Sequence, residues 1–74
     1  MRCFEGLFKA VRDDEWVVRY AAAYGLEQRL NGAAVSAHLA EQGRAALAQL
    51  ATDAEGVRVV QLRALKALQR LNAG

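Results

Sequence analysis

The stretch DDEWVVRYAAAYGLEQRL, residues 13–30, combines an acidic turn with a long run of helix-forming residues. Within it Trp16, Tyr20 and Tyr24 recur at every fourth position. Residues four apart lie on one side of an α-helix, so the stretch predicts a helix with an aromatic stripe. The Asn-Gly pair at 31–32 ends this predicted helix, because both residue types tolerate the left-handed cap conformation.

The pattern of this stretch recurs at an offset of 39 residues. Each unit reads as a helix, an acidic turn and a second helix, and a period of this size is typical of helical-hairpin repeats. The matched pairs are Asp14 with Asp53, Val18 with Val57, Arg19 with Arg58, Leu26 with Leu65, Phe8 with Leu47 and Val11 with Leu50.

The rest of the chain also favours helices, because it contains no proline and is rich in strong helix formers. Ser36 fits the N-cap of a third helix, which Gly43 could split. The predicted helices lie near residues 3–12, 14–30, 36–51 and 54–72. The sequence therefore predicts an all-α fold, a short α-solenoid of two helical hairpins. It forms a single domain over residues 1–74, with repeat units at about 3–30 and 43–72 and a connector at 31–42.

The composition restricts which partners and which cellular compartment we expect for the protein. Ten Lys and Arg against eight Asp and Glu give a net charge of +2, which does not by itself indicate a nucleic-acid partner. The excess positive charge lies in the C-terminal half. The single cysteine, Cys3, cannot form an internal disulfide, and no apolar run approaches the roughly 20 residues of a membrane span. We therefore expect a cytoplasmic protein without membrane insertion.

The matched aspartates and arginines predict a structural role that is repeated once per unit. Asp14 and Asp53 fit N-caps of the second helix in each hairpin. Arg19 and Arg58 stand just inside those helices, where each could reach the turn aspartate of the adjoining unit. We expect a ladder between the hairpins in which Arg58 reaches toward Asp14 or its turn.

The aromatic stripe and the last helix are the candidate contact surfaces. The stripe either packs between hairpins or against a second subunit, or it forms a flat contact for a ligand or partner. The last helix is amphipathic, and its basic side is either a solvated face or a contact for acidic groups. Its apolar side consists of Val57, Val60, Ala64, Ala67, Leu68 and Leu71, and its basic side consists of Arg63, Lys66 and Arg70.

His38 and Cys3 have no partner motif in the sequence. A metal site needs several ligands together, and a thiol nucleophile needs a base and an orienting group. We therefore expect no metal site, and we assign no catalytic residue.

The first unit resembles the HEAT-like repeat of the phycobilisome lyase group. Units of that repeat have an acidic turn, often a tryptophan, then Val-Arg-Tyr-Ala-Ala and a leucine one turn further on. The matching residues here are Asp14, Trp16, Val18, Arg19, Tyr20, Ala21, Ala22 and Leu26. The second unit is a degenerate copy: it keeps Asp53, Val57, Arg58 and the Ala64-Leu65 step, but Gly56 falls near the tryptophan position.

This resemblance implies a HEAT-like binding module that handles pigments, because such proteins attach, remove or help dismantle bilins on phycobiliproteins. We expect it to bind a phycobiliprotein, a phycocyanobilin-type bilin, or both, with no required cofactor. Any enzymatic activity would be of the bilin lyase type within a larger complex. The expected contact residues are Trp16, Tyr20, Tyr24, Arg63, Lys66 and Arg70.

Two other functions remain open from the residues themselves. One is a general protein-interaction scaffold with no pigment role. The other is a weak nucleic-acid binder that uses the C-terminal basic face.

Assembly follows from the number of repeats. About three or more units are usually needed to cover the apolar faces of such hairpins, and this chain has two. We therefore expect a homodimer or an obligate complex with a longer HEAT-like subunit.

Overall fold

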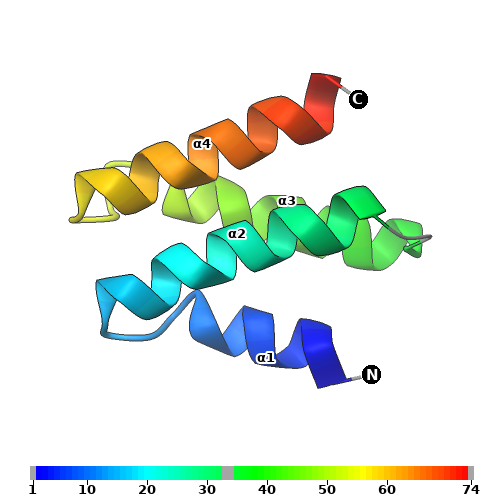
Figure 1. Cartoon of the computed structure of the whole chain (residues 1–74), viewed down its shortest axis with the longest axis horizontal. Coiled ribbons are helices and arrows are strands. Elements are labelled where there is room, and N and C mark those ends of the chain that lie inside the picture. The colour runs from blue at the N-terminus through cyan, green and yellow to red at the C-terminus, as the bar shows by residue number, and fades with distance from the viewer. Residues whose placement is uncertain (1, 33–34, 74) are drawn as a thin grey trace.

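The structure is a computed structural model that describes residues 2–32 and 35–73. This part of the chain contains four α-helices and no strand, which confirms the predicted all-α class (Figure 1). None of the described helices has both the length and the apolar character needed to cross a bilayer. The helices are α1 (Arg2–Ala10), α2 (Trp16–Gly32), α3 (Ala37–Leu50) and α4 (Arg58–Ala73).

The helices form two antiparallel hairpins, α1 with α2 and α3 with α4 (Figure 1). α2 and α4 run in the same direction, and the packing between them is the most extensive of any helix pair. α3 also packs against α2, so the second hairpin covers one side of the first. This arrangement is that of a short helical-repeat solenoid.

The start and the continuity of α3 have local causes. Ser36 is its N-cap, as predicted, and the Ser36 hydroxyl oxygen accepts a hydrogen bond of 3.2 Å from the backbone N–H of Leu39. The helix continues through Gly43 and is not split there. A Cβ atom at Gly43 would lie 2.8 Å from a methyl carbon of Leu30, so glycine allows α2 and α3 to approach closely. α3 spans Ala37–Leu50, close to the predicted range of 36–51.

The hydrophobic core lies between the two hairpins. Its buried residues come from α2, α3 and α4, while the apolar side chains of α1 pack at its margin and are only half buried. Small alanine side chains make up much of it, which lets the helices approach closely. The apolar side predicted for α4 does face this core. The core consists of Ala23, Leu26, Leu47, Leu50, Val60, Ala64 and Ala67.

A pair of leucine substitutions tests the position of this core. Leu26 is 0% exposed, so Leu26→Ala should lower the free energy of unfolding by about 2–5 kcal/mol, through lost burial and the cavity left behind. Leu62 is 47% exposed on α4, and Leu62→Ala should change it by about 0.5 kcal/mol or less. Urea unfolding followed by circular dichroism measures both values, and equal losses would contradict the core described here.

Candidate functional site

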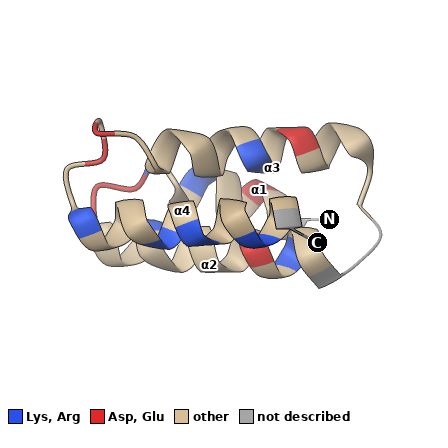
Figure 2. Ribbon diagram, turned by 90° about the horizontal axis from the view of Figure 1, so that it is seen from above, with Lys and Arg blue, Asp and Glu red and all other residues tan. Residues whose placement is uncertain are grey.

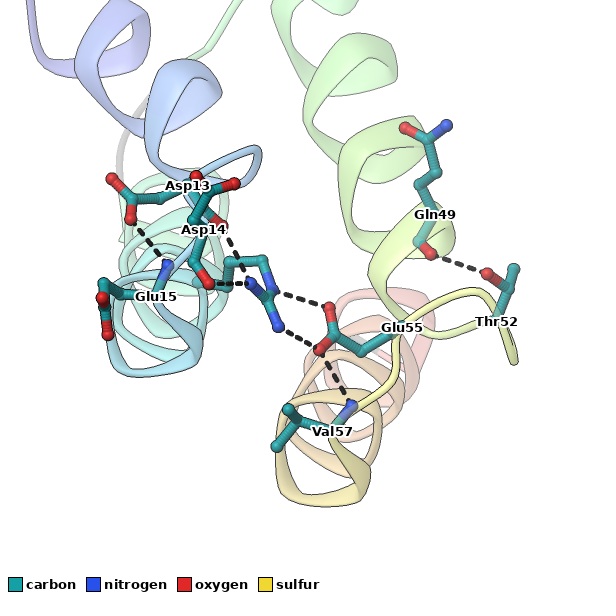
Figure 3. A network of polar contacts seen from close by, with 8 residues as sticks. Asp13, Asp14, Glu15, Gln49, Thr52, Glu55 and Val57 are labelled. Carbon is teal, nitrogen blue, oxygen red and sulfur yellow. Dashed lines mark hydrogen bonds and ion pairs between the residues drawn. The ribbon is translucent and has the colours of Figure 1, made fainter.

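One arginine joins the turns of the two hairpins. Nε and Nη2 of Arg19 donate to the two carboxylate oxygens of Glu55 at 2.9 and 2.7 Å. Nη1 of Arg19 also donates to the backbone carbonyls of Asp13 and Asp14, at 2.8 and 3.1 Å. The carboxylate of Glu55 in turn accepts the backbone N–H of Val57 at 3.2 Å (Figure 3). This network fixes the start of α2 against the turn before α4.

The electrostatics of this contact favour the charged form of both groups. The hydrogen bond from Arg19 lowers the pKa of Glu55 below its ordinary value of 4.5, and the N–H of Val57 adds to this effect. Burial opposes the shift, because the Glu55 side chain is only 4% exposed. The same hydrogen bond raises the pKa of Arg19.

The predicted contact between Arg58 and Asp14 is wrong. Nη1 of Arg58 donates to the side-chain oxygen of Gln61, one turn further along α4, at 2.9 Å. Arg58 forms no ion pair with any carboxylate of the described residues. The link between the hairpins runs from Arg19 to the turn of the second unit, as expected for this arginine, but its partner there is Glu55 and not Asp53.

The predicted N-cap role of Asp14 is also wrong. α2 begins at Trp16, and the residue before it is Glu15. The carboxylate of Asp13 accepts the backbone N–H of Glu15 at 2.8 Å, whereas Asp14 contributes its backbone carbonyl to Arg19. The acidic turn thus holds its shape through Asp13.

Asp53 differs from its prediction in a related way. α4 begins at Arg58, several residues beyond Asp53, so Asp53 is too far away to cap it. Its carboxylate accepts instead from the side-chain amide of Gln61 at 3.2 Å, and the same amide donates to the carbonyl of Ala51 at 3.3 Å. Gln61 therefore binds the turn of the second hairpin, as Arg19 binds the turn of the first hairpin.

A second ion pair is buried deeper, between α2 and α4. The carboxylate of Glu27 accepts a hydrogen bond from Nη2 of Arg63, and Nη1 of Arg70 lies 3.4 Å from its other oxygen. Glu27 is 1% exposed, so its charge depends on these cations for compensation. Glu27 was not among the site residues predicted from the sequence. Its position one residue after Leu26, on the side of α2 that faces the core, was the available signal.

The sequence predicted that Arg63 lies on an exposed basic face of the last helix. The structure contradicts this prediction. The side chain of Arg63 is 12% exposed, and its guanidinium carbon lies 5.2 Å from the centre of the Tyr24 ring, a distance typical of cation–π contacts. Nε of Arg63 is buried and has no hydrogen-bond partner within the described residues. Arg63 is thus held between Glu27 and Tyr24, while Lys66 and Arg70 remain exposed on α4. Figure 2 shows Lys and Arg positions, in blue, along α4.

The aromatic stripe is largely at the surface. Trp16, Tyr20 and Tyr24 are 45%, 36% and 52% exposed, so packing between the hairpins accounts for only part of their area. Beside them lies a shallow groove of about 190 Å³ that is lined from both α2 and α4. We call this region the outer α2–α4 surface. It consists of Trp16, Tyr20, Tyr24, Val59, Leu62, Arg63, Lys66 and Arg70.

Other candidate positions do not join this surface. A groove of about 360 Å³ between the first hairpin and α3 is lined by Phe8 and Val11 together with Gln42 and Gln49. His38 is exposed on α3, and among the residues that the structure describes no cluster of three or more His, Cys, Asp or Glu could hold a metal ion. The side chain of Cys3 lies outside the described residues.

The Arg19–Glu55 contact makes the free energy of unfolding depend on pH. A lowered pKa in the folded state stabilises the fold above pH 4.5, and this stabilisation is lost as the pH falls through the lowered pKa. We expect Glu55→Gln to be less stable than the wild type at pH 7 and to lose less stability on acidification. Glu41→Gln, an exposed change on α3, should keep the wild-type profile. Urea unfolding between pH 7 and pH 3 measures this, and parallel profiles for Glu55→Gln and wild type would contradict it.

Breaking the buried Glu27–Arg63 pair should lower the free energy of unfolding more than breaking the Arg19–Glu55 contact. Glu27→Gln leaves Arg63 without its buried counter-charge and should lower the free energy of unfolding by about 3 kcal/mol. Replacing both residues by leucine removes the unpaired charge, so Glu27→Leu with Arg63→Leu should recover most of that loss. Chemical denaturation at pH 7 measures both variants. If Glu27→Gln costs no more than the surface change Glu41→Gln, the pair does not stabilise the fold.

A comparison with known proteins finds a relative in bilin metabolism. The chain is 44% identical, over 70 residues that make up 95% of its length, to the bilin biosynthesis protein RpcF of Synechococcus sp. (strain WH8020). The chain spans 32% of the length of that relative. No family model and no solved structure matches the chain. The predicted resemblance to the phycobilisome lyase group is therefore confirmed over nearly the whole chain.

Proposed function

We propose that the chain is a HEAT-like binding module that holds a bilin, a phycobiliprotein, or both during pigment attachment, removal or phycobilisome handling. The observation that carries this proposal is the outer α2–α4 surface, where exposed aromatic rings stand beside exposed cations. The similarity to a bilin biosynthesis protein supports the choice of ligand.

The chemistry of a bilin fits the residues of this surface. A bilin is a flexible chain of four flat pyrrole rings with two propionate groups. Exposed rings such as Tyr20 offer flat apolar contact area, and Lys66 and Arg70 can form charge-assisted hydrogen bonds with carboxylates. Glu27 carries one negative charge among the three cations Arg63, Lys66 and Arg70, which leaves a net charge of +2. That charge equals the charge of two propionates in magnitude.

The size of the groove suggests how the ligand is held. Its volume of about 190 Å³ is smaller than the roughly 300–1,000 Å³ of pockets that enclose small molecules. We infer that the surface contacts one side of the bilin and leaves the other side accessible to the acceptor protein. The role of the module is then to hold pigment and client in register. Any lyase-type activity is proposed for a larger complex, because the chain corresponds to about a third of its relative.

Binding of phycocyanobilin by the purified chain tests the pigment role. We expect a change in its absorbance spectrum on mixing with the wild type, and a dissociation constant raised about tenfold by Lys66→Gln, the loss of one charged hydrogen bond. Tyr20→Ala should also weaken binding. Arg44→Gln, an exposed change on α3, is the matched control and should bind like the wild type.

Circular dichroism must first show that each variant is folded. Absence of any spectral change with the wild type would contradict pigment binding. Equal affinity of Lys66→Gln, Tyr20→Ala and the control would show that the ligand binds elsewhere.

A protein-interaction scaffold without a pigment role is a second candidate. Val17 and Leu65 are 57% and 38% exposed on α2 and α4, and such apolar positions are suited to protein contacts. No response to free phycocyanobilin, together with no binding to a phycobiliprotein, would favour a scaffold without a pigment role.

A further inference from the structure

A groove along α3 takes no part in the proposed function. The groove of about 360 Å³ described above and a neighbouring hollow of about 380 Å³ share four lining residues, so the two are continuous. We call this region the α3 groove. It shares no residue with the outer α2–α4 surface, and Figure 2 shows α3 on the other side of the molecule from α2 and α4. It is defined by Phe8, Val11, Arg12, Gln42, Ala46 and Gln49.

The α3 groove combines half-buried apolar residues with exposed polar ones. Phe8 and Val11 are half buried, whereas Arg12, Gln42 and Gln49 are exposed. Within the described part of the chain, the side-chain amides of Gln42 and Gln49 form no hydrogen bond. The groove therefore offers two amides whose donors and acceptors are not used by the fold.

The two glutamines match the spacing of peptide groups in an extended chain. Gln42 and Gln49 are two turns apart on one side of α3, about 10 Å along the helix. An extended chain advances about 3.3 Å per residue, so peptide groups about three residues apart stand at the same distance. A side-chain amide both donates and accepts hydrogen bonds, as a peptide group does. A helical ligand would not use these amides, because its own peptide groups already bond to one another.

The charge of the α3 groove favours an acidic ligand. Arg12 and Glu55 are the charged residues among those described as lining it. The charge of Glu55 is compensated by Arg19. Arg12 forms no ion pair with any carboxylate of the described residues. The lining thus carries one uncompensated positive charge, and a carboxylate is its natural partner.

The distance between Arg12 and Phe8 sets the spacing of the ligand's side chains. The backbone N–H groups of Val11 and Arg12 still bond back to carbonyls of α1, each at 3.1 Å. Arg12 therefore stands about one helical turn, roughly 6 Å, beyond Phe8. In an extended chain, side chains two residues apart lie on the same face, about 7 Å from one another. An acidic residue at Arg12 thus places the residue two positions away at Phe8.

We propose that the α3 groove binds an extended peptide segment of a partner protein. The segment carries Asp or Glu against Arg12 and a large apolar residue, two positions away, against Phe8. Gln42 and Gln49 bond its backbone, so the main chain supplies affinity and the two side chains supply specificity. Because this site is separate from the outer α2–α4 surface, it does not depend on whether that surface binds a bilin.

Selection from a phage-displayed library tests the proposal without any pigment. The library contains random peptides of about nine residues, roughly 30 Å when extended, which is longer than the span between the two glutamines. We expect enrichment of peptides in which Asp or Glu stands two positions from a large apolar residue. Fluorescence anisotropy of the best peptide, labelled with fluorescein, then gives dissociation constants for the wild type and its variants.

The variants separate the contributions of charge and backbone bonding. Arg12→Gln should raise the dissociation constant about tenfold, and so should Gln42→Ala combined with Gln49→Ala. Arg12→Glu should abolish binding of the acidic peptide and bind the same peptide with lysine in place of its acidic residue. Arg44→Gln is the matched control, since Arg44 is exposed on α3 but does not line the groove.

Several results would overturn the proposal. One is a library from which no peptide is enriched, and another is a selected peptide that binds all folded variants as tightly as the wild type. Failure of the lysine peptide to bind folded Arg12→Glu would show that Arg12 does not recognise the acidic residue. Enriched peptides with apolar residues at alternating spacings of three and four would indicate a helical ligand, which also contradicts an extended one. Circular dichroism establishes that each variant is folded.

Discussion

The structure depends on the packing of α2 against α4. Most of the core lies beside this contact. Ion pairs join the hairpins at two places, one between their turns and one in the buried part between the helices. Arg19 joins the turns through Glu55, and Glu27 binds Arg63 in the buried part. Burying a carboxylate is costly unless it is paired. The Glu27–Arg63 pair therefore disfavours any shift of α4 along α2 that would separate the two charges.

This constraint also positions the candidate ligand surface. Because Glu27 holds Arg63 between the helices, the guanidinium lies against the ring of Tyr24, and both contribute to the outer face. Arg70 lies near the same carboxylate but is 57% exposed and can turn toward a ligand. The Glu27–Arg63 pair thus holds Arg63 against the Tyr24 ring, while the exposed cations Lys66 and Arg70 are available for acidic groups.

The helices and the repeat could be predicted from sequence, because local propensity and spacing determine them. Ser36 as a cap and Arg19 as a link between hairpins follow from residue type and position. The partners could not be predicted. Glu55 stands at the repeat position of Trp16, so alignment of the two units gave no reason to expect a carboxylate there. Glu27 resembles an ordinary surface residue of a helix until α4 is placed beside it.

We propose that a bilin binds at the outer α2–α4 surface, and one measurement tests this most directly. Backbone amide shifts in a nitrogen-15 NMR titration with phycocyanobilin locate the contact residue by residue. The account predicts shifts concentrated at Tyr20, Tyr24 and Lys66, with little change along α1 and α3. Shifts confined to the groove between the first hairpin and α3, or no shifts at all, would contradict it.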